Sequence, residues 1–205
     1  HRGDKLAFVG QLRVNDFYQV TRVMTVAAEG GTPCDLSGHL DNWIAADSLN
    51  VSSVNLARLN FSPDDSALIT TFDRRGANYL ASIDLVRGDV KELFGGAALI
   101  GLPRLTPDGQ RLVYAQEDAT HPPELFIRPL AGGETRRLSH WHDGLLAEVK
   151  LSTPQKLTVK NAAGDSVESW LYPPLDPEPG KKYPLVLYIH GGPQGFDGDY
   201  FDVGL

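Results

Sequence analysis

The sequence has little cysteine, no clustered positive charge and no long apolar run. Its one cysteine, Cys34, cannot form a disulfide within the chain, which fits a reducing compartment and favours a cytoplasmic protein. No apolar run approaches the roughly 20 residues of a membrane-spanning helix, so we expect no membrane partner. No run of Lys and Arg exceeds two residues and the formal net charge is −7, so we expect no nucleic-acid partner.

What the sequence does contain is an internal repeat. FSPDDSALIT begins at Phe61 and LTPDGQRLVYA begins at Leu105, which places Pro63 and Pro107 44 residues apart. Short β-prone runs with tight turns and a period of about 40 to 45 residues are typical of four-stranded β-propeller blades. In each unit the Ser/Thr-Pro-Asp-Asp/Gly sequence supplies turn chemistry and predicts a strand directly after it. The first unit has a longer spacing, which predicts an insertion near residues 37–59.

The repeat accounts for about two blades and part of a third. Propellers close rings of roughly 4 to 8 blades, because each blade buries its apolar faces only against its neighbours. We therefore expect a fragment, whose partners include the missing remainder of the same polypeptide or another fragment of it.

The period stops after Leu138, and a different pattern follows. Residues 154–172 predict two strands around an Asn-Ala-Ala-Gly-Asp turn, with Leu157 and Val159 on one face. A proline-rich connection then leads into YPLVLYIHGGPQG, whose apolar run 185–189 predicts a strand buried on both faces.

The glycine turn after that run has three interpretations. A phosphate loop would need GxxxxGK[ST] or GxGxxG, neither of which is present, and Pro193 removes a backbone amide. An oxyanion hole of the HGG type fits the order of strand, His190, Gly191 and Gly192, because glycines let backbone N–H donors approach a carbonyl oxygen. A plain Gly-Gly turn at the end of a strand fits the motif equally well.

The order of these features resembles the prolyl oligopeptidase family of serine peptidases, in its acylaminoacyl-peptidase-like branch. The propeller repeat, LTVKNAAGDSVESWLYPP and YPLVLYIHGGPQG follow one another as in that family, and the resemblance covers essentially the whole chain. It implies a mainly β fold. Residues 1–148 would be the C-terminal blades of a propeller, and residues 149–205 would be the first strands of an incomplete α/β-hydrolase domain.

The resemblance also implies a function, which is hydrolysis of short or N-acylated peptides with a propeller that restricts entry. Gly192 would supply the oxyanion-hole amide, Gly191 the freedom of the turn, and His190 would position the turn. The Ser-Asp-His triad would lie outside this chain, which contains no GxSxG. The implied partner is a peptide substrate, no cofactor is needed, and homo-oligomerisation stays open.

Three weaker candidates remain. His140 and His142, two positions apart, would share one face of a strand, but no further metal ligand is near, so we assign no metal site. The acidic residues Asp197, Asp199 and Asp202 lack calcium-loop spacing and are interpreted as a solvated loop. Arg74 and Arg75 either meet a peptide carboxylate in the central cavity or form an exposed turn pair, which we favour.

Two other function classes are left open by the residues. One is a non-catalytic propeller that is similar to TolB-type repeats and acts as a binding scaffold. The other keeps the hydrolase fold but is an esterase or an inactive homologue, because fold alone does not fix function.

Overall fold

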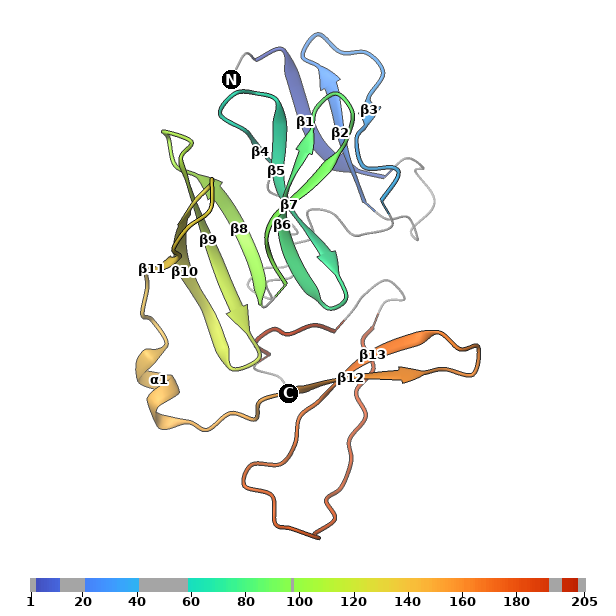
Figure 1. Cartoon of the computed structure of the whole chain (residues 1–205), viewed down its shortest axis with the longest axis vertical. Helices are drawn as coiled ribbons and strands as arrows, with labels where there is room; N and C mark the ends of the chain where they lie inside the picture. The colour runs from blue at the N-terminus through green and yellow to red at the C-terminus, as the bar shows by residue number, and fades with distance from the viewer. Residues whose placement is uncertain (1–2, 12–20, 41–58, 97, 192–196, 203–205) are drawn as a thin grey trace.

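The computed structural model describes residues 3–11, 21–40, 59–96, 98–191 and 197–202. Within these residues three antiparallel sheets lie side by side, and a hairpin crosses beneath them (Figure 1). The insertion predicted near residues 37–59 falls largely outside the described residues.

The first sheet is a partial blade of three strands. It is formed by β1 (Lys5–Gly10), β2 (Arg22–Ala27) and β3 (Cys34–Asp35), which pair in chain order. Val23 and Leu36 are buried on the face that turns toward the second sheet.

The second and third sheets are complete four-stranded blades. One contains β4 (Asn60–Phe61), β5 (Ala67–Arg74), β6 (Ala77–Asp84) and β7 (Val90–Gly95), paired in that order. The other contains β8 (Leu99–Leu105), β9 (Arg111–Asp118), β10 (His121–Pro129) and β11 (Arg136–Arg137), again in chain order. The predicted fold class, about two blades and part of a third, is confirmed.

The repeated Ser/Thr-Pro-Asp turn behaves as the sequence predicts. Ser62 Oγ donates to Asp64 Oδ1 (2.6 Å) and accepts from the amide of Ala67 (2.9 Å). In the next unit, Thr106 Oγ1 likewise donates to Asp108 Oδ1 and accepts from the amide of Arg111. The next position has a positive φ in both units, 57° at Asp65 and 67° at Gly109, a conformation that Asp tolerates and Gly adopts freely.

Blade faces pack directly against each other and form the core. Strand β5 is buried on both faces, so Leu68 and Phe72 pack toward the first sheet while Ile69 packs toward the third. Between the second and third sheets, Ile69, Leu80, Ile100, Leu112 and Tyr114 form one buried cluster.

After the third blade the chain runs through the short helix α1 (Asp143–Glu148) into the hairpin β12 (Gln155–Lys160) and β13 (Ser166–Leu171). The hairpin lies where the sequence predicts it. None of the helices in the described ranges is long and apolar enough to cross a membrane.

The predicted buried strand over residues 185–189 does not form. These residues have no strand hydrogen bonds, and their exposed fractions run from 59% at Tyr188 to 88% at Val186. A strand requires a neighbour to satisfy its backbone N–H and C=O groups, and the described part of the chain places no strand beside this run.

Leu112 provides a test of blade-to-blade packing. Its side chain is fully buried in the cluster between the second and third sheets, so Leu112→Ala should lower the free energy of unfolding by about 3 kcal/mol. Val86→Ala is the control, because Val86 is 84% exposed and should change stability by less than about 0.5 kcal/mol. Equal effects in urea denaturation would contradict the assigned core.

Candidate active site

The glycine turn lies at the end of an extended segment. His190 and Gly191 are described, whereas Gly192 and Pro193 lie outside the described residues. His190 Nδ1 donates a hydrogen bond to the carbonyl oxygen of Gly191 (2.9 Å). A Cβ built on Gly191 would meet no atom within 4 Å, so packing among the described residues does not explain the glycine there.

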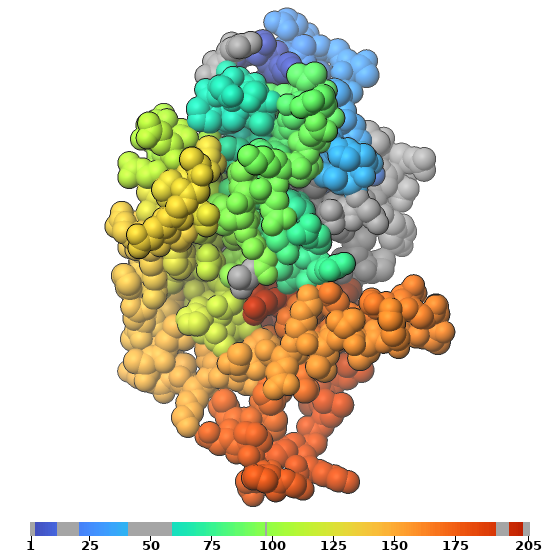
Figure 2. Space-filling view, viewed as in Figure 1, coloured from blue at the N-terminus to red at the C-terminus, as the bar shows by residue number. Residues whose placement is uncertain are grey.

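A wide groove of about 1940 Å³ borders this turn. Its walls come from the β5–β6 turn, the hairpin, the extended segment up to His190 and the segment 197–202. In Figure 2 the red C-terminal atoms emerge between the green blade loops and the orange hairpin. The groove therefore lies where residues far apart in the sequence meet.

Two tyrosines on the groove wall stay protonated at neutral pH. Burial, followed by the negative charge of Asp197, raises the pKa of Tyr200 far above its usual value, and its hydroxyl donates to Asp197 Oδ1 (3.2 Å). Burial and the carboxylates of the segment 197–202 raise the pKa of Tyr172 as well. Both phenols therefore keep their proton, and that of Tyr200 is directed at Asp197.

The arginine pair divides into two different environments. Arg74 forms an ion pair with Glu92 (Nη2 to Oε2, 3.0 Å) and stacks on the ring of Tyr79 at 4.3 Å. Arg75 has a positive φ of 54°, and its carbonyl oxygen accepts from Lys156 Nζ (2.7 Å). Both residues are exposed at the β5–β6 turn, as we favoured from the sequence, and both border the groove.

The acidic residues also differ from the solvated loop predicted from the sequence. Asp197, Asp199 and Asp202 are half-buried against the blades. Asp199 Oδ1 accepts from the backbone amide of Ala119 (2.9 Å), and the amide of Asp199 donates to the carbonyl of Gly76 (3.2 Å). The loop is held because blade loops offer it backbone partners.

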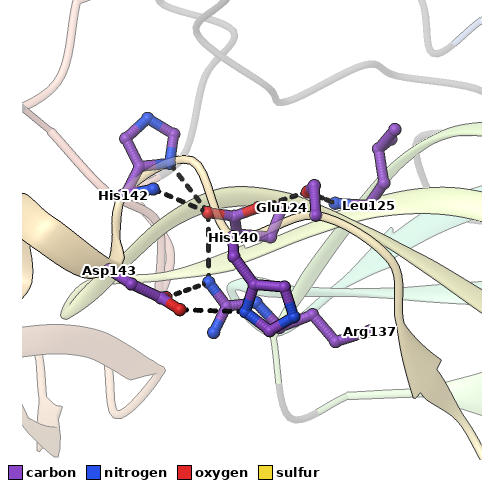
Figure 3. A network of polar contacts seen from close by, with 7 residues as sticks. Glu124, Leu125, Arg137, His140, His142 and Asp143 are labelled. Carbon is purple, nitrogen blue, oxygen red and sulfur yellow. Dashed lines mark hydrogen bonds and ion pairs between the residues drawn. The ribbon is translucent and has the colours of Figure 1, made fainter.

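The histidine pair is not on a strand and does not share a face. Figure 3 shows His140 and His142 in separate contacts at the exit of the third blade, where His140 Nδ1 meets Asp143 Oδ2 (2.9 Å) and His142 Nδ1 meets Glu124 Oε1 (3.2 Å). Arg137 joins the two carboxylates through one nitrogen. Across the described ranges no group of three or more His, Cys, Asp or Glu residues could hold a metal ion.

Sequence reasoning did not identify Glu124, nor Gly76 and Trp170, which meet at the β5–β6 turn. Glu124 lies in a strand whose sequence carries no motif, and its buried carboxylate is recognised only once Ser139 and His142 fold back onto it. The third blade therefore ends in a polar network that fixes the chain as it leaves the propeller.

The chain is similar to known peptidases in sequence and in structure. No family model matches it. An uncharacterized peptidase, YuxL of Bacillus subtilis, is 35% identical over 89 residues, which cover 43% of this chain and 13% of that protein. The acylaminoacyl peptidase of Pyrococcus horikoshii superposes with a TM-score of 0.72 at 20% identity over 98% of this chain. The chain has the fold of the matching part of acylaminoacyl peptidases.

An acylaminoacyl peptidase in complex with Z-Gly-Gly-Phe-chloromethyl ketone gives a TM-score of 0.75 at 22% identity, again over 98% of this chain. A putative TolB from Agrobacterium tumefaciens gives 0.51 at 17% identity over 67% of this chain and 43% of its own. This chain spans 28% of each acylaminoacyl peptidase. The peptidase likeness thus includes the part after the blades, and the resemblance inferred from the sequence is confirmed.

The polar network at the exit of the third blade consists of Glu124, Arg137, Ser139, His142 and Asp143. Glu124 makes the stability that this network contributes dependent on pH. Burial alone would raise the pKa of its carboxyl, but hydrogen bonds from Ser139, the amide of His142 and Arg137 lower it from 4.5 to about 2. A lowered folded-state pKa stabilises the protein above pH 4.5, and that stability is lost as the pH falls toward 2. Glu124→Gln should cost about 2 kcal/mol at pH 7 and flatten the pH dependence of stability in that window.

Thermal unfolding measured between pH 2 and pH 7 tests this prediction. Asp165→Asn is the control, because Asp165 is an exposed turn residue with no connection to the network. An unchanged acid slope in Glu124→Gln would contradict the account of the network.

Proposed function

We propose that this chain is part of a serine peptidase that hydrolyses short or N-acylated peptides. In this proposal residues 1–148 are the C-terminal blades of the propeller and residues 149–205 begin the α/β-hydrolase domain. The observation that carries it is the likeness to acylaminoacyl peptidases over 98% of the chain, with the His190–Gly191 turn beside a groove between blade loops and hairpin.

The glycine turn would act as half of an oxyanion hole. An activated Ser attacks the peptide carbonyl, a His takes and returns the proton, and an Asp orients the His. The amide of Gly192 would donate to the oxygen that becomes negative. Gly191 would keep the approach open, and the bond from His190 to the Gly191 carbonyl would hold the turn. The triad would come from residues outside this chain.

The propeller would restrict which substrates reach the turn. Blade loops and the hairpin both line the groove, so a bulky folded protein would meet both. Short peptides, including those with a blocked amino terminus, would fit a groove of about 1940 Å³. The mechanism requires no cofactor.

Two other functions compete with this proposal. A TolB-like binding scaffold accounts for the blades, but the TolB likeness covers only 67% of the chain and gives the glycine turn no role. An esterase or an inactive homologue would share the fold, and only a reaction test separates these from a peptidase.

Labelling with a fluorophosphonate probe tests catalysis in the full-length protein that contains this chain. We expect covalent modification of one serine and hydrolysis of N-acylated short peptides. A well-folded protein in which no serine reacts would overturn the proposal, and labelling with hydrolysis of simple esters but not of peptides would favour the esterase.

Gly191→Ala separates activity from stability. Because a Cβ at Gly191 meets no described atom within 4 Å and no left-handed φ is required there, the substitution should leave the melting temperature unchanged. It should slow peptide hydrolysis about tenfold or more, since the new methyl group displaces the carbonyl from the donor amide.

Gly144→Ala is the matched control, because Gly144 is equally open and lies in α1, away from the turn. Equal rates for the two variants would contradict a role for the turn in catalysis.

A further inference from the structure

The β5–β6 turn holds two segments that are distant in the sequence. Arg75 and Gly76 form a two-residue hairpin turn between the paired residues Arg74 and Ala77, with φ values of 54° and 67°. Positive φ at both central residues is the type I′ geometry that suits a twisted hairpin. The carbonyl of Arg75 accepts from Lys156 Nζ (2.7 Å), and the carbonyl of Gly76 accepts from the amide of Asp199 (3.2 Å).

The same turn fits the indole of Trp170 because position 76 has no side chain. A Cβ on Gly76 would lie 2.1 Å from Cη2 and 2.5 Å from Cζ2 of Trp170, and 3.2 Å from the carbonyl oxygen of Asp197. Contacts below 3.0 Å require one partner to move. Lys156 lies over the Trp170 ring at 5.3 Å and forms an ion pair with Glu168 (3.2 Å), so the indole is held in place.

The equivalent turn of the next blade binds the same segment. Ala119 is 44 residues after Arg75 and thus occupies the corresponding position of the repeat. Its backbone amide donates to Asp199 Oδ1 (2.9 Å). The loop is braced by Asp118, which accepts from the amide (2.8 Å) and the hydroxyl (2.8 Å) of Thr120. Asp199 therefore bridges corresponding turns of two adjacent blades, accepting from one and donating to the other.

We propose that these two blade turns are the docking site on the propeller for the hairpin 155–171 and the segment 197–202, and that Gly76 and Asp199 are positioning residues for the turn at His190 and Gly191. The docked segment 197–202 begins six residues after Gly191 in the chain, and both this segment and the docked hairpin line the groove that borders the turn. The positioning role of Gly76 and Asp199 rests on the proposed function, whereas the docking of the two segments does not.

The docking site is tested with two pairs of variants of the full-length protein. Gly76→Ala is compared with Gly132→Ala, because Gly132 also lies in a blade turn with a positive φ (96°) but has nothing within 4 Å of a Cβ. Asp199→Ala is compared with Asp199→Asn, which keeps an Oδ1 acceptor for the amide of Ala119. The asparagine should rescue the contact that the alanine removes.

Hydrogen exchange followed by mass spectrometry reports docking, and the rate of fluorophosphonate labelling reports positioning. In Gly76→Ala and Asp199→Ala we expect faster exchange in peptides covering residues 155–171 and 197–202, and labelling slowed about tenfold. Gly132→Ala and Asp199→Asn should match the wild type in both measurements. If Gly76→Ala does not fold, the Asp199 pair decides the question.

Exchange and labelling in Gly76→Ala equal to those in Gly132→Ala would overturn the proposal. Faster exchange without slower labelling would overturn the positioning role and leave only a structural contact. A wild-type protein that is never labelled would overturn the proposed function, while the exchange comparison would still decide whether the turns are the docking site.

Discussion

The structure depends on blades packing face to face. Ile69 and Leu80 of one blade meet Ile100, Leu112 and Tyr114 of the next in a buried cluster, and burial of apolar surface is the main favourable term in folding. Two side-chain amides join the same blades, since Asn60 Nδ2 donates to the carbonyl of Pro103 (3.0 Å) and Asn78 Oδ1 accepts from the amide of Ile100. This packing brings corresponding turns of adjacent blades to one end of the molecule.

Because corresponding turns lie at the same end of the molecule, two adjacent blades can bind the same segment of the chain. Gly76 and Ala119 belong to corresponding turns, and both contact Asp199 through the backbone. A single half-buried residue after the glycine turn can therefore be fixed by two blades at once. In this account the propeller does more than border the groove, because it also sets where the other wall of the groove lies.

The sequence predicted the features that repeat or that are local. The 44-residue step between Pro63 and Pro107 predicted the blades, and the Asn-Ala-Ala-Gly-Asp turn predicted the hairpin, because turn residues act through their own backbone. The predictions from the sequence were wrong where the structure depends on a neighbouring strand or on a contact between side chains. The run 185–189 has strand composition, but the described residues place no strand beside it. His142 binds the carboxylate of Glu124, which lies 18 residues earlier in strand β10, and His140 binds Asp143 three residues further on, so the two histidines have separate partners. The contact between Trp170 and Gly76 leaves no mark in the sequence, since either residue alone is ordinary.

The central claim is that the turn after His190 supplies an oxyanion-hole amide. The most direct measurement is a crystal structure of the full-length protein carrying a covalent phosphonate on its reactive serine. The account predicts a phosphonyl oxygen about 3 Å from the backbone nitrogen of Gly192, with the His190 to Gly191 hydrogen bond retained. A serine adduct whose oxygen is bound elsewhere, with Gly192 facing away from it, would contradict the account.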